Sequence, residues 1–559
     1  MVDYVEYDQL LSAAGEFGLY QVLMFFKISP FYIFGGFVYF SQLFLTEVPE
    51  NHWCRIPELE NMTILERRDL AIPVDPDSPV GYSRCSSYVA NWTELLLTGN
   101  RPNQTWETQK CQYGWEFNTT EIPYPTISSD LGWVCDKDSY QATAQSLFFV
   151  GSIIGGFVIG WVADRFGRIP ATVFANVIGC IAGVASTFTT TFFTFTICRI
   201  IMGMSYDNCM MMAYLLVLEY VAPKYRTMIA NLSFAVFFTI GVTALPWIAI
   251  ACGHWKVISL VTSIPLALAL LTPFVLPESP RWLITRDRLD EVIGNVKAIA
   301  RTNNKEVPKK LMEQFKTSCE KNKQEEYLSL FELLKRPVLR NMFLCICAEY
   351  FCCMIIYDAL VRSLGSLQFD FFVSFTVTSF TEFPSLVLLS FTLDLIGRKW
   401  SSIIVLTTCA VFSFITPFVR GGLPSVLCAV FARFACNMAC NSMLQWQAEL
   451  LPTSVRGSGT SVTHICGYIA TCVAPFVAYL NVYVSWLPMV IIGAVSVFSA
   501  AICCYLPETA MKEMPQTLEQ VEKMMANRKL WEMPCLRKKK ENKDIDRSDG
   551  HTNNMFEMN

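Results

Sequence analysis

Four acidic residues lie inside long apolar segments of this 559-residue chain. They are Asp207, Glu349, Asp358 and Glu382. An ionisable side chain is costly within a lipid bilayer, and therefore it usually faces a cavity or an oppositely charged partner. Arg199 and Arg433 are the comparable basic residues, since Lys27 lies near the end of its segment. This excess of acids predicts a cavity with uncompensated negative charge, which suits a cation.

Aromatic residues occupy the same set of apolar segments. They are Tyr350, Tyr357, Phe238, Trp247 and Tyr468. The face of an aromatic ring attracts an ammonium group by about 0.5–2 kcal/mol per contact. Carboxylates combined with aromatic rings therefore predict a binding site for a small organic cation. The alternative for each acid is a buried hydrogen bond to another helix, without a role in binding.

Motifs for nucleotide hydrolysis and metal binding are absent from the sequence. There is no G-x-x-x-x-G-K-[ST] loop, no H-E-x-x-H motif and no close cluster of His and Cys; His464 is one of four histidines. The formal net charge of −4 comes without a basic stripe that would indicate nucleic acid. We therefore predict that the protein is not an enzyme and has no metal, cofactor or nucleic-acid partner. A solute would then move down its own gradient, with the membrane potential or with a coupled ion.

The elements that position these residues are membrane helices. Hydrophobic residues make up 53% of the chain and charged residues 16%, whereas a soluble domain carries about 25% charged residues. A run of about 20 apolar residues is long enough to cross a bilayer as a helix. Twelve such segments are predicted, at 22–46, 141–163, 169–190, 195–218, 228–251, 256–276, 338–360, 371–393, 400–419, 423–447, 459–481 and 485–506.

Charged residues in the short loops between these segments recur at one constant spacing. The first set is Asp164, Arg168, Glu219, Arg226 and Glu278, and the second, 230 residues later, is Asp394, Arg398, Glu449, Arg456 and Glu508. Arg165 lies beside Asp164 in the same charged loop. A repeated constellation of this kind indicates a duplicated half, as in two-repeat transporters. We expect these charges to latch the two halves when the cavity faces outward. The alternative is that they only set the topology and cap helix ends.

Residues 47–139 form one long polar loop after the first helix. It contains four cysteines and four N-x-S/T sequons: Cys54, Cys85, Cys111 and Cys135, with Asn61, Asn91, Asn103 and Asn118. This combination predicts an extracellular, glycosylated segment that is held by disulfides. Four cysteines allow three pairings, and the spacing does not select one.

Lysine and arginine concentrate in the loops on the other side of the predicted membrane, which places both termini in the cytosol. The chain then divides into five parts in a multi-pass protein of the plasma membrane. These are an N-terminus (1–21), a first six-helix bundle (22–276) with its extracellular loop (47–139), cytosolic linker helices (277–337), a second six-helix bundle (338–506) and a cytosolic tail (507–559).

The chain resembles the organic cation/anion/zwitterion transporter family of the major facilitator superfamily. The segments that carry the resemblance are Gly15–Gln21, the cysteine-and-sequon loop, Asp164–Arg168, Pro277–Leu283, Asp394–Arg398 and Ala448–Arg456. The resemblance implies an all-α membrane protein with twelve helices in two six-helix pseudo-repeats. It also implies a central cavity and electrogenic or facilitated movement of small charged organic molecules.

Individual residues carry the resemblance only in part. Tyr357, Glu382 and Phe238 match positions of the cation transporters. Tyr468 stands where cation transporters have Asp and where anion and carnitine transporters have Arg, which leaves cation binding to Asp207, Asp358 and Glu382. Asp207 itself stands where cation relatives often have Lys.

These observations favour a plasma-membrane transporter of small organic cations that works by alternating access. The expected site combines Asp207, Asp358 and Glu382 with the aromatic residues Tyr350, Tyr357, Phe238 and Tyr468. A first alternative is a Na⁺- or H⁺-coupled transporter of zwitterions such as carnitine, β-alanine or a β-alanyl amine like carcinine. A second alternative is a membrane sensor or adhesion protein that transports nothing.

Overall fold

The computed structural model describes residues 7–529 except 77, 79, 99–101, 104, 223–224, 227–228, 230–231, 322–329, 368, 420–421, 453–454, 511 and 513. Within these residues, twelve helical segments are long and apolar enough to cross a membrane. Each overlaps one of the twelve segments predicted from the sequence, so the chain is a multi-pass membrane protein.

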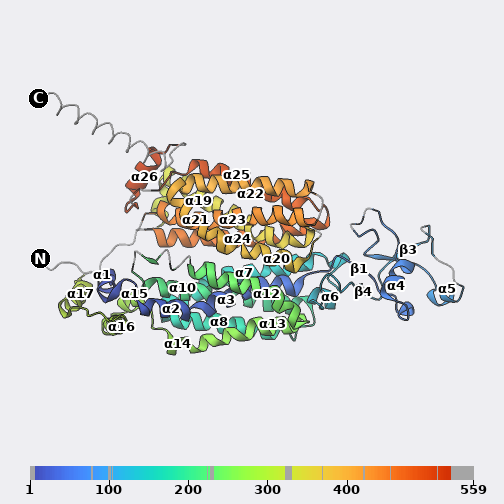
Figure 1. Ribbon diagram of the computed structural model, residues 1–559, viewed down its shortest axis with the longest axis horizontal. Coiled ribbons are helices and arrows are strands. Elements are labelled where there is room, and N and C mark those ends of the chain that lie inside the picture. Colours follow the sequence, from blue (N-terminus) through green and yellow to red (C-terminus); the bar gives the residue numbers. More distant parts are fainter. Residues whose placement is uncertain are drawn as a thin grey trace, which may run out of the picture.

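The twelve segments form two groups of six, which lie side by side in Figure 1. The first half contains α2 and α3 (Leu19–Lys27, Ser29–Thr46), α7 (Ser139–Phe166), α8 (Arg168–Ser186), α9 and α10 (Phe192–Ser205, Asn208–Glu219), η3 and α12 (Phe234–Phe238, Thr239–Cys252), and α13, η4 and α14 (Trp255–Ser263, Ile264–Leu271, Thr272–Val275). The second half contains α19 (Pro337–Arg362), α20 and α21 (Phe371–Phe380, Glu382–Ile396), α22 (Arg398–Ile415), α23 (Leu423–Leu450), α24 (Arg456–Tyr479) and α25 (Leu487–Tyr505).

The two ends of this bundle differ. The end that carries residues 47–139 is called the loop end here, and it lies on the right of Figure 1. The opposite end, called the linker end, carries the short helices α1, α15, α16, α17, α18 and α26 (Tyr7–Gly15, Pro280–Thr285, Leu289–Thr302, Lys309–Lys321, Leu330–Lys335, Leu518–Ala526). The predicted tail beyond residue 529 lies outside the described residues.

The segment 47–139 folds around two short antiparallel strand pairs. Strand β1 (His52–Cys54) pairs with β4 (Trp115–Phe117), and β2 (Ser86–Tyr88) pairs with β3 (Thr108–Lys110). Short helices connect them: η1 (Pro57–Leu59), α4 (Ile64–Ala71), α5 (Trp92–Thr98), α6 (Ile127–Leu131) and η2 (Cys135–Lys137).

Two disulfides hold this segment together. All four predicted cysteines are used, in the pairs Cys54–Cys111 and Cys85–Cys135. The sequon residues Asn61, Asn91 and Asn103 are exposed, and Asn118 is half-buried. Glycosylation at these four positions stays a prediction.

The sequence repeat corresponds to a helix-capping contact that occurs once in each half, at the linker end. Glu278 accepts hydrogen bonds from the backbone N–H groups of Arg168 and Ile169, at 2.8 and 3.1 Å. In the second half Glu508 accepts from Arg398 and Lys399, at 2.9 and 3.0 Å. A carboxylate at a helix N-terminus satisfies unpaired N–H groups and the helix dipole. The duplication therefore preserves a capping contact at the start of α8 and of α22.

Several predicted helices are divided in the structure, and two of the divisions, within the predicted segments 195–218 and 371–393, lie at predicted carboxylates. The first break separates α9 from α10 at Tyr206 and Asp207, and the second separates α20 from α21 at Thr381. Pro384 accounts for the second break, because proline has no N–H to donate to residue 380 and crowds that carbonyl. Each break places one of the predicted carboxylates, Asp207 or Glu382, at the start of a half-helix.

Candidate functional site

Aromatic rings close the two halves against each other at the loop end. Phe44 of α3 lies 5.5, 6.0 and 5.0 Å, between ring centroids, from the α20 residues Phe371, Phe372 and Phe375. Phe40, one turn earlier on α3, also meets Phe375, at 5.4 Å. Apolar packing therefore joins the halves beside the loop.

A polar network crosses between the halves beside this cluster. Asp358 and Arg362, one turn apart on α19, form an ion pair at 2.7 Å, and their side chains are 2% and 4% exposed. From the first half, the Tyr39 hydroxyl donates to Asp358 at 2.7 Å, and Gln145 accepts a hydrogen bond from Arg362. The helix predicted over 338–360 ended before Arg362, whereas Arg362 is the last residue of α19. Asp358 is therefore not the uncompensated acid that was predicted; it belongs to a contact that holds the loop end closed.

Glu382 is also neutralised by an arginine of its own half. Arg433 of α23 donates to it at 3.0 Å, and the Tyr357 hydroxyl donates to it at 2.9 Å. The Arg433 guanidinium lies 3.5 Å from the centroid of the Tyr357 ring. Removal of either charge would leave the other alone in an interior where both side chains are almost fully buried.

Asp207 differs from these two acids, since it forms no ion pair with any residue that the structure describes. Its carboxylate accepts a hydrogen bond from the hydroxyl of Tyr468, which lies on α24 of the other half. It is near enough to Tyr350 and His464 to act on them electrostatically, and those two rings are 5.4 Å apart. Asp207 is half-buried. The structure thus brings together Asp207, Tyr350 and Tyr468 between the halves.

Two further predicted residues, Glu349 and Phe238, have surroundings that differ from those of Asp207 and pack within their own halves. Glu349 is fully buried in the second half, where it accepts from Cys353 at 3.1 Å and from Ser499 at 3.5 Å. Phe238 is the last residue of the π-helical turn η3 and stacks on Phe234 at 4.4 Å. Their contacts are those of packing residues.

A chain of contacts connects the loop-end network with Asp207. Tyr39, which binds Asp358, stacks on Tyr206 with ring centroids 4.8 Å apart and an interplanar angle of 15°. Tyr206 precedes Asp207 at the break between α9 and α10. The sequence analysis missed Tyr39, Tyr206 and Gln145, because only the packing of helices far apart in the chain shows their role.

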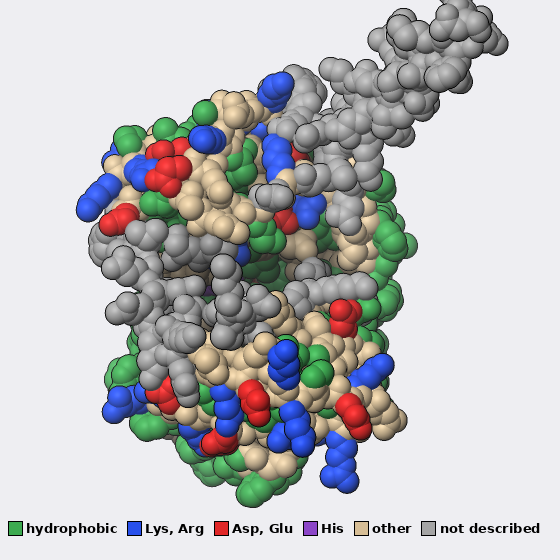
Figure 2. All heavy atoms as spheres, turned by 90° about the vertical axis from the view of Figure 1, so that its left-hand side faces the viewer, with side chains coloured by type: hydrophobic (Ala, Val, Ile, Leu, Met, Phe, Trp, Pro, Cys, Tyr) green, Lys and Arg blue, Asp and Glu red, His purple; other side chains and the backbone are tan. Residues whose placement is uncertain are grey.

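The linker end is hollowed between the two halves, and apolar side chains lie deep in the hollow (Figure 2). Charged side chains gather on the rims of both halves in the same view. Three of their ion pairs each stay within one half: Asp164–Arg168 at 3.1 Å, Asp8–Arg226 at 2.6 Å and Arg398–Glu449 at 2.9 Å. The structure is thus closed at the loop end and hollow at the linker end.

The other predicted gating residues make contacts at the linker end. Glu219 accepts from the hydroxyl of Ser279, and Arg456 donates to the carbonyl of Leu451 at 3.2 Å. Arg165 is exposed. The side chain of Asp394 lies outside the described part of the structure. No group of three or more His, Cys, Asp or Glu side chains in the described ranges is arranged to hold a metal ion.

Comparisons with known proteins agree with this architecture. Residues 97–524 match the family described as "Sugar (and other) transporter". The chain is 30% identical over 538 residues to the carcinine transporter of Drosophila melanogaster, with 93% of this chain and 79% of that protein covered. It is 27% identical over 528 residues to the organic cation/carnitine transporter 2 of Homo sapiens, with 92% and 94% covered.

Solved structures show the same fold. The chain is similar to the xylose transporter XylE from E. coli in its inward open conformation, with a TM-score of 0.57 and 16% sequence identity. The likeness covers 89% of this chain and 99% of that chain.

The Glu382–Arg433 pair gives a test of buried-charge compensation. Replacing Arg433 with Met leaves Glu382 without its counter-ion, and we expect the free energy of unfolding to fall by about 3–5 kcal/mol. The double variant Arg433→Met/Glu382→Gln should recover most of this loss. Thermal unfolding of the purified protein measures both.

Arg340→Met is the matched control for that pair, because Arg340 is exposed on α19 and should change stability by only about 0.5 kcal/mol. An Arg433→Met protein as stable as the Arg340→Met protein would contradict the account.

Proposed function

The chain belongs to the sugar (and other) transporter family, and we propose that it carries small organic cations across the plasma membrane by alternating access. One observation carries the proposal: Asp207, between the halves, forms no ion pair with any residue in the described part of the chain. The name of one relative, the organic cation transporter protein of Drosophila melanogaster, supports the same substrate class.

The surroundings of Asp207 suit an ammonium group. Two tyrosines are near the carboxylate: Tyr468 donates its hydroxyl to Asp207, and Tyr350 is close enough to interact with it electrostatically. Each contact between a cation and such a ring would add about 0.5–2 kcal/mol. Glu382 and Asp358 are already held by arginines, so a cationic ligand would have to compete for them. Asp207 is therefore the proposed counter-ion of the substrate, and Tyr350 and Tyr468 are its proposed binding partners.

Alternating access follows from the contrast between the two ends. We propose that the loop end faces the cell exterior and that the linker end and both termini face the cytosol. Opening the exterior side requires separation of Tyr39 from Asp358 and of Gln145 from Arg362, since each pair joins the two halves. Closing the cytosolic side brings the charged rims of Figure 2 together.

A zwitterion is the second candidate substrate. Arg433 is buried against Tyr357, and its Nε has no hydrogen-bond partner among the described residues. A ligand carboxylate could pair with this guanidinium while its ammonium group lies against Asp207. Relatives named for carcinine and for β-alanine support this alternative, with Na⁺ or H⁺ as the proposed coupling ion.

Uptake of labelled tetraethylammonium, carnitine and β-alanine by expressing cells tests these proposals. We expect Asp207→Asn to lower tetraethylammonium uptake by at least about tenfold at unchanged surface expression, because the substrate loses its charged partner. Glu349→Gln is the matched control: it also removes a membrane-buried acid, but one that lies inside the second half.

Three outcomes decide between the alternatives. Equal uptake by wild type and the Asp207→Asn variant would refute the role of Asp207. Uptake of carnitine or β-alanine that requires Na⁺ or a proton gradient would favour the zwitterion. Absence of uptake for every solute, with the protein at the cell surface, would favour a sensor.

The linker-end charges are proposed to latch the halves in the outward-facing state. In the present arrangement Asp164 is 81% exposed and pairs only within its own half, so Asp164→Asn should change stability by about 0–1 kcal/mol. We expect this variant to reach the surface normally but to show a lower maximal uptake rate.

Glu291→Gln, which removes a comparably exposed pair with Arg288 on α16, should leave uptake unchanged. Wild-type kinetics in the Asp164→Asn variant would remove the latch role.

A further inference from the structure

A pocket lies at the loop end, where Arg362 of the Asp358–Arg362 network is one of its lining residues. Its volume is about 250 Å³. Both halves and the 47–139 segment line it, with Glu47, Glu50, Arg84, Asp138, Arg362 and Tyr479 among its side chains. The pocket is therefore separate from Asp207, which is not among its lining residues.

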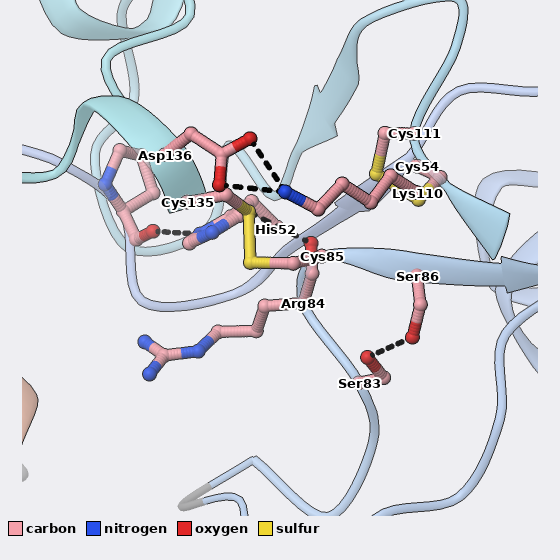
Figure 3. The surroundings of a disulfide bond; sticks show 11 residues. His52, Cys54, Ser83, Arg84, Cys85, Ser86, Lys110, Cys111, Cys135 and Asp136 are labelled. Atoms are coloured by element: carbon pink, nitrogen blue, oxygen red, sulfur yellow. Dashed lines mark hydrogen bonds and ion pairs between the residues drawn. A yellow bond between two sulfur atoms is a disulfide. The ribbon is translucent and has the colours of Figure 1, made fainter.

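Carboxylates outnumber available basic groups in this loop-end pocket. Glu47, Glu50 and Asp138 face it, and Arg362 is already paired with Asp358. Arg84 remains as the one basic side chain without an ion pair to a described residue, and Figure 3 shows its guanidinium directed away from the Cys85–Cys135 disulfide. Burial lowers the pKa of His52 to about 4, so this residue is neutral at physiological pH. The pocket therefore has an excess of acidic over available basic side chains.

Glu47 is the acid most strongly affected by this environment. It follows α3 directly, and Gln141 of α7 donates to it at 3.4 Å. Burial, and then the neighbouring charge of Glu50, raises the pKa of Glu47 to about 8. Burial also raises the pKa of Glu50, with a further contribution from Glu121. At neutral pH Glu47 is therefore mostly protonated. A cation bound beside it would favour release of this proton, because it stabilises the carboxylate.

We propose that the loop-end pocket is a second binding site for small organic ammonium ions, with Glu47 and Glu50 as counter-ions and Tyr479 as an aromatic wall. Glu50, His52, Arg84, Asp138 and Arg362 line the pocket together with Glu47. Gln141 donates a hydrogen bond to Glu47, and Tyr124 interacts with it electrostatically. A cation bound there replaces the proton of Glu47. Affinity therefore rises as the external pH increases through the pKa of this carboxyl. The inference does not require that the bound ion is transported.

Tetramethylammonium is the probe, because its charge does not change with pH. Its binding to the purified full-length protein is measured by calorimetry at pH 6 and pH 9, in an Asp207→Asn background that disables the central site. We expect binding about tenfold tighter at pH 9 than at pH 6. Adding Glu47→Gln should reduce the pH 9 affinity to the pH 6 value. Glu50→Gln should weaken binding at both pH values.

Asp136→Asn is the matched control. Asp136 belongs to the same segment, but it is 76% exposed, pairs with Lys110 at 2.9 Å and does not line the pocket. The Asp136→Asn variant should bind tetramethylammonium with the same affinity and pH dependence as the Asp207→Asn protein that carries it. A common melting temperature shows that all variants are folded.

Loss of all tetramethylammonium binding in the Asp207→Asn protein would overturn the loop-end site and leave the central site standing. The loop-end site would also be overturned if adding Glu47→Gln left the tetramethylammonium affinity unchanged. It would be overturned too if the affinity of the Asp207→Asn protein did not depend on pH. Binding at the loop-end site without any uptake of cations would instead contradict the proposed transport function alone.

Discussion

A charge inside a membrane must be neutralised, and this constraint organises the interior of the protein. A single charge near the bilayer centre costs about 2.5–3.5 kcal/mol even on insertion scales. Asp358 meets the constraint with Arg362, and Glu382 meets it with Arg433 and the Tyr357 hydroxyl. Asp207 forms no ion pair in the described structure, and its carboxylate accepts a hydrogen bond from the Tyr468 hydroxyl. Glu349 also lacks an ion pair with any described residue, but it is buried inside the second half. Among the carboxylates where the halves meet, Asp207 has no paired cation in the described structure and is best suited to a cationic ligand.

The broken helices place these charges where the halves meet. Asp207 starts the half-helix α10 and Glu382 starts α21, and N–H groups at a helix N-terminus stabilise negative charge by about 0.3–1 kcal/mol. The stacked pair Tyr39 and Tyr206 lies between Asp207 and the Asp358–Arg362 network. A ligand at Asp207 would therefore lie next to Tyr206, which stacks on the tyrosine that binds Asp358 at the loop end. This continuity gives a physical route by which binding and opening can be coupled.

Much of the fold could be read from the sequence because its signals are local. Apolar segments predicted the twelve helices, and the spaced loop charges predicted a duplication that returns as the Glu278 and Glu508 caps. The cysteines of the loop were recognised, but their pairing depends on how distant strands meet. The break at Tyr206 and Asp207 has no proline to announce it.

The candidate site was harder to predict, since charge balance depends on pairs between helices. Glu382 and Arg433 are far apart in the chain, as are Asp207 and Tyr468. The Asp358–Arg362 pair is an exception. Its spacing of one helical turn was visible, and it was missed because the helix was taken to end before Arg362.

The central claim is that a carboxylate between the halves recognises positive charge. Choline and 3,3-dimethyl-1-butanol have the same shape and differ in the charged nitrogen, so their affinities for the purified protein measure charge recognition alone. The account predicts that choline binds at least about tenfold more tightly than the neutral alcohol and that Asp207→Asn removes most of this difference. Equal affinities in the wild-type protein, or a preference for choline that survives in the variant, would contradict it.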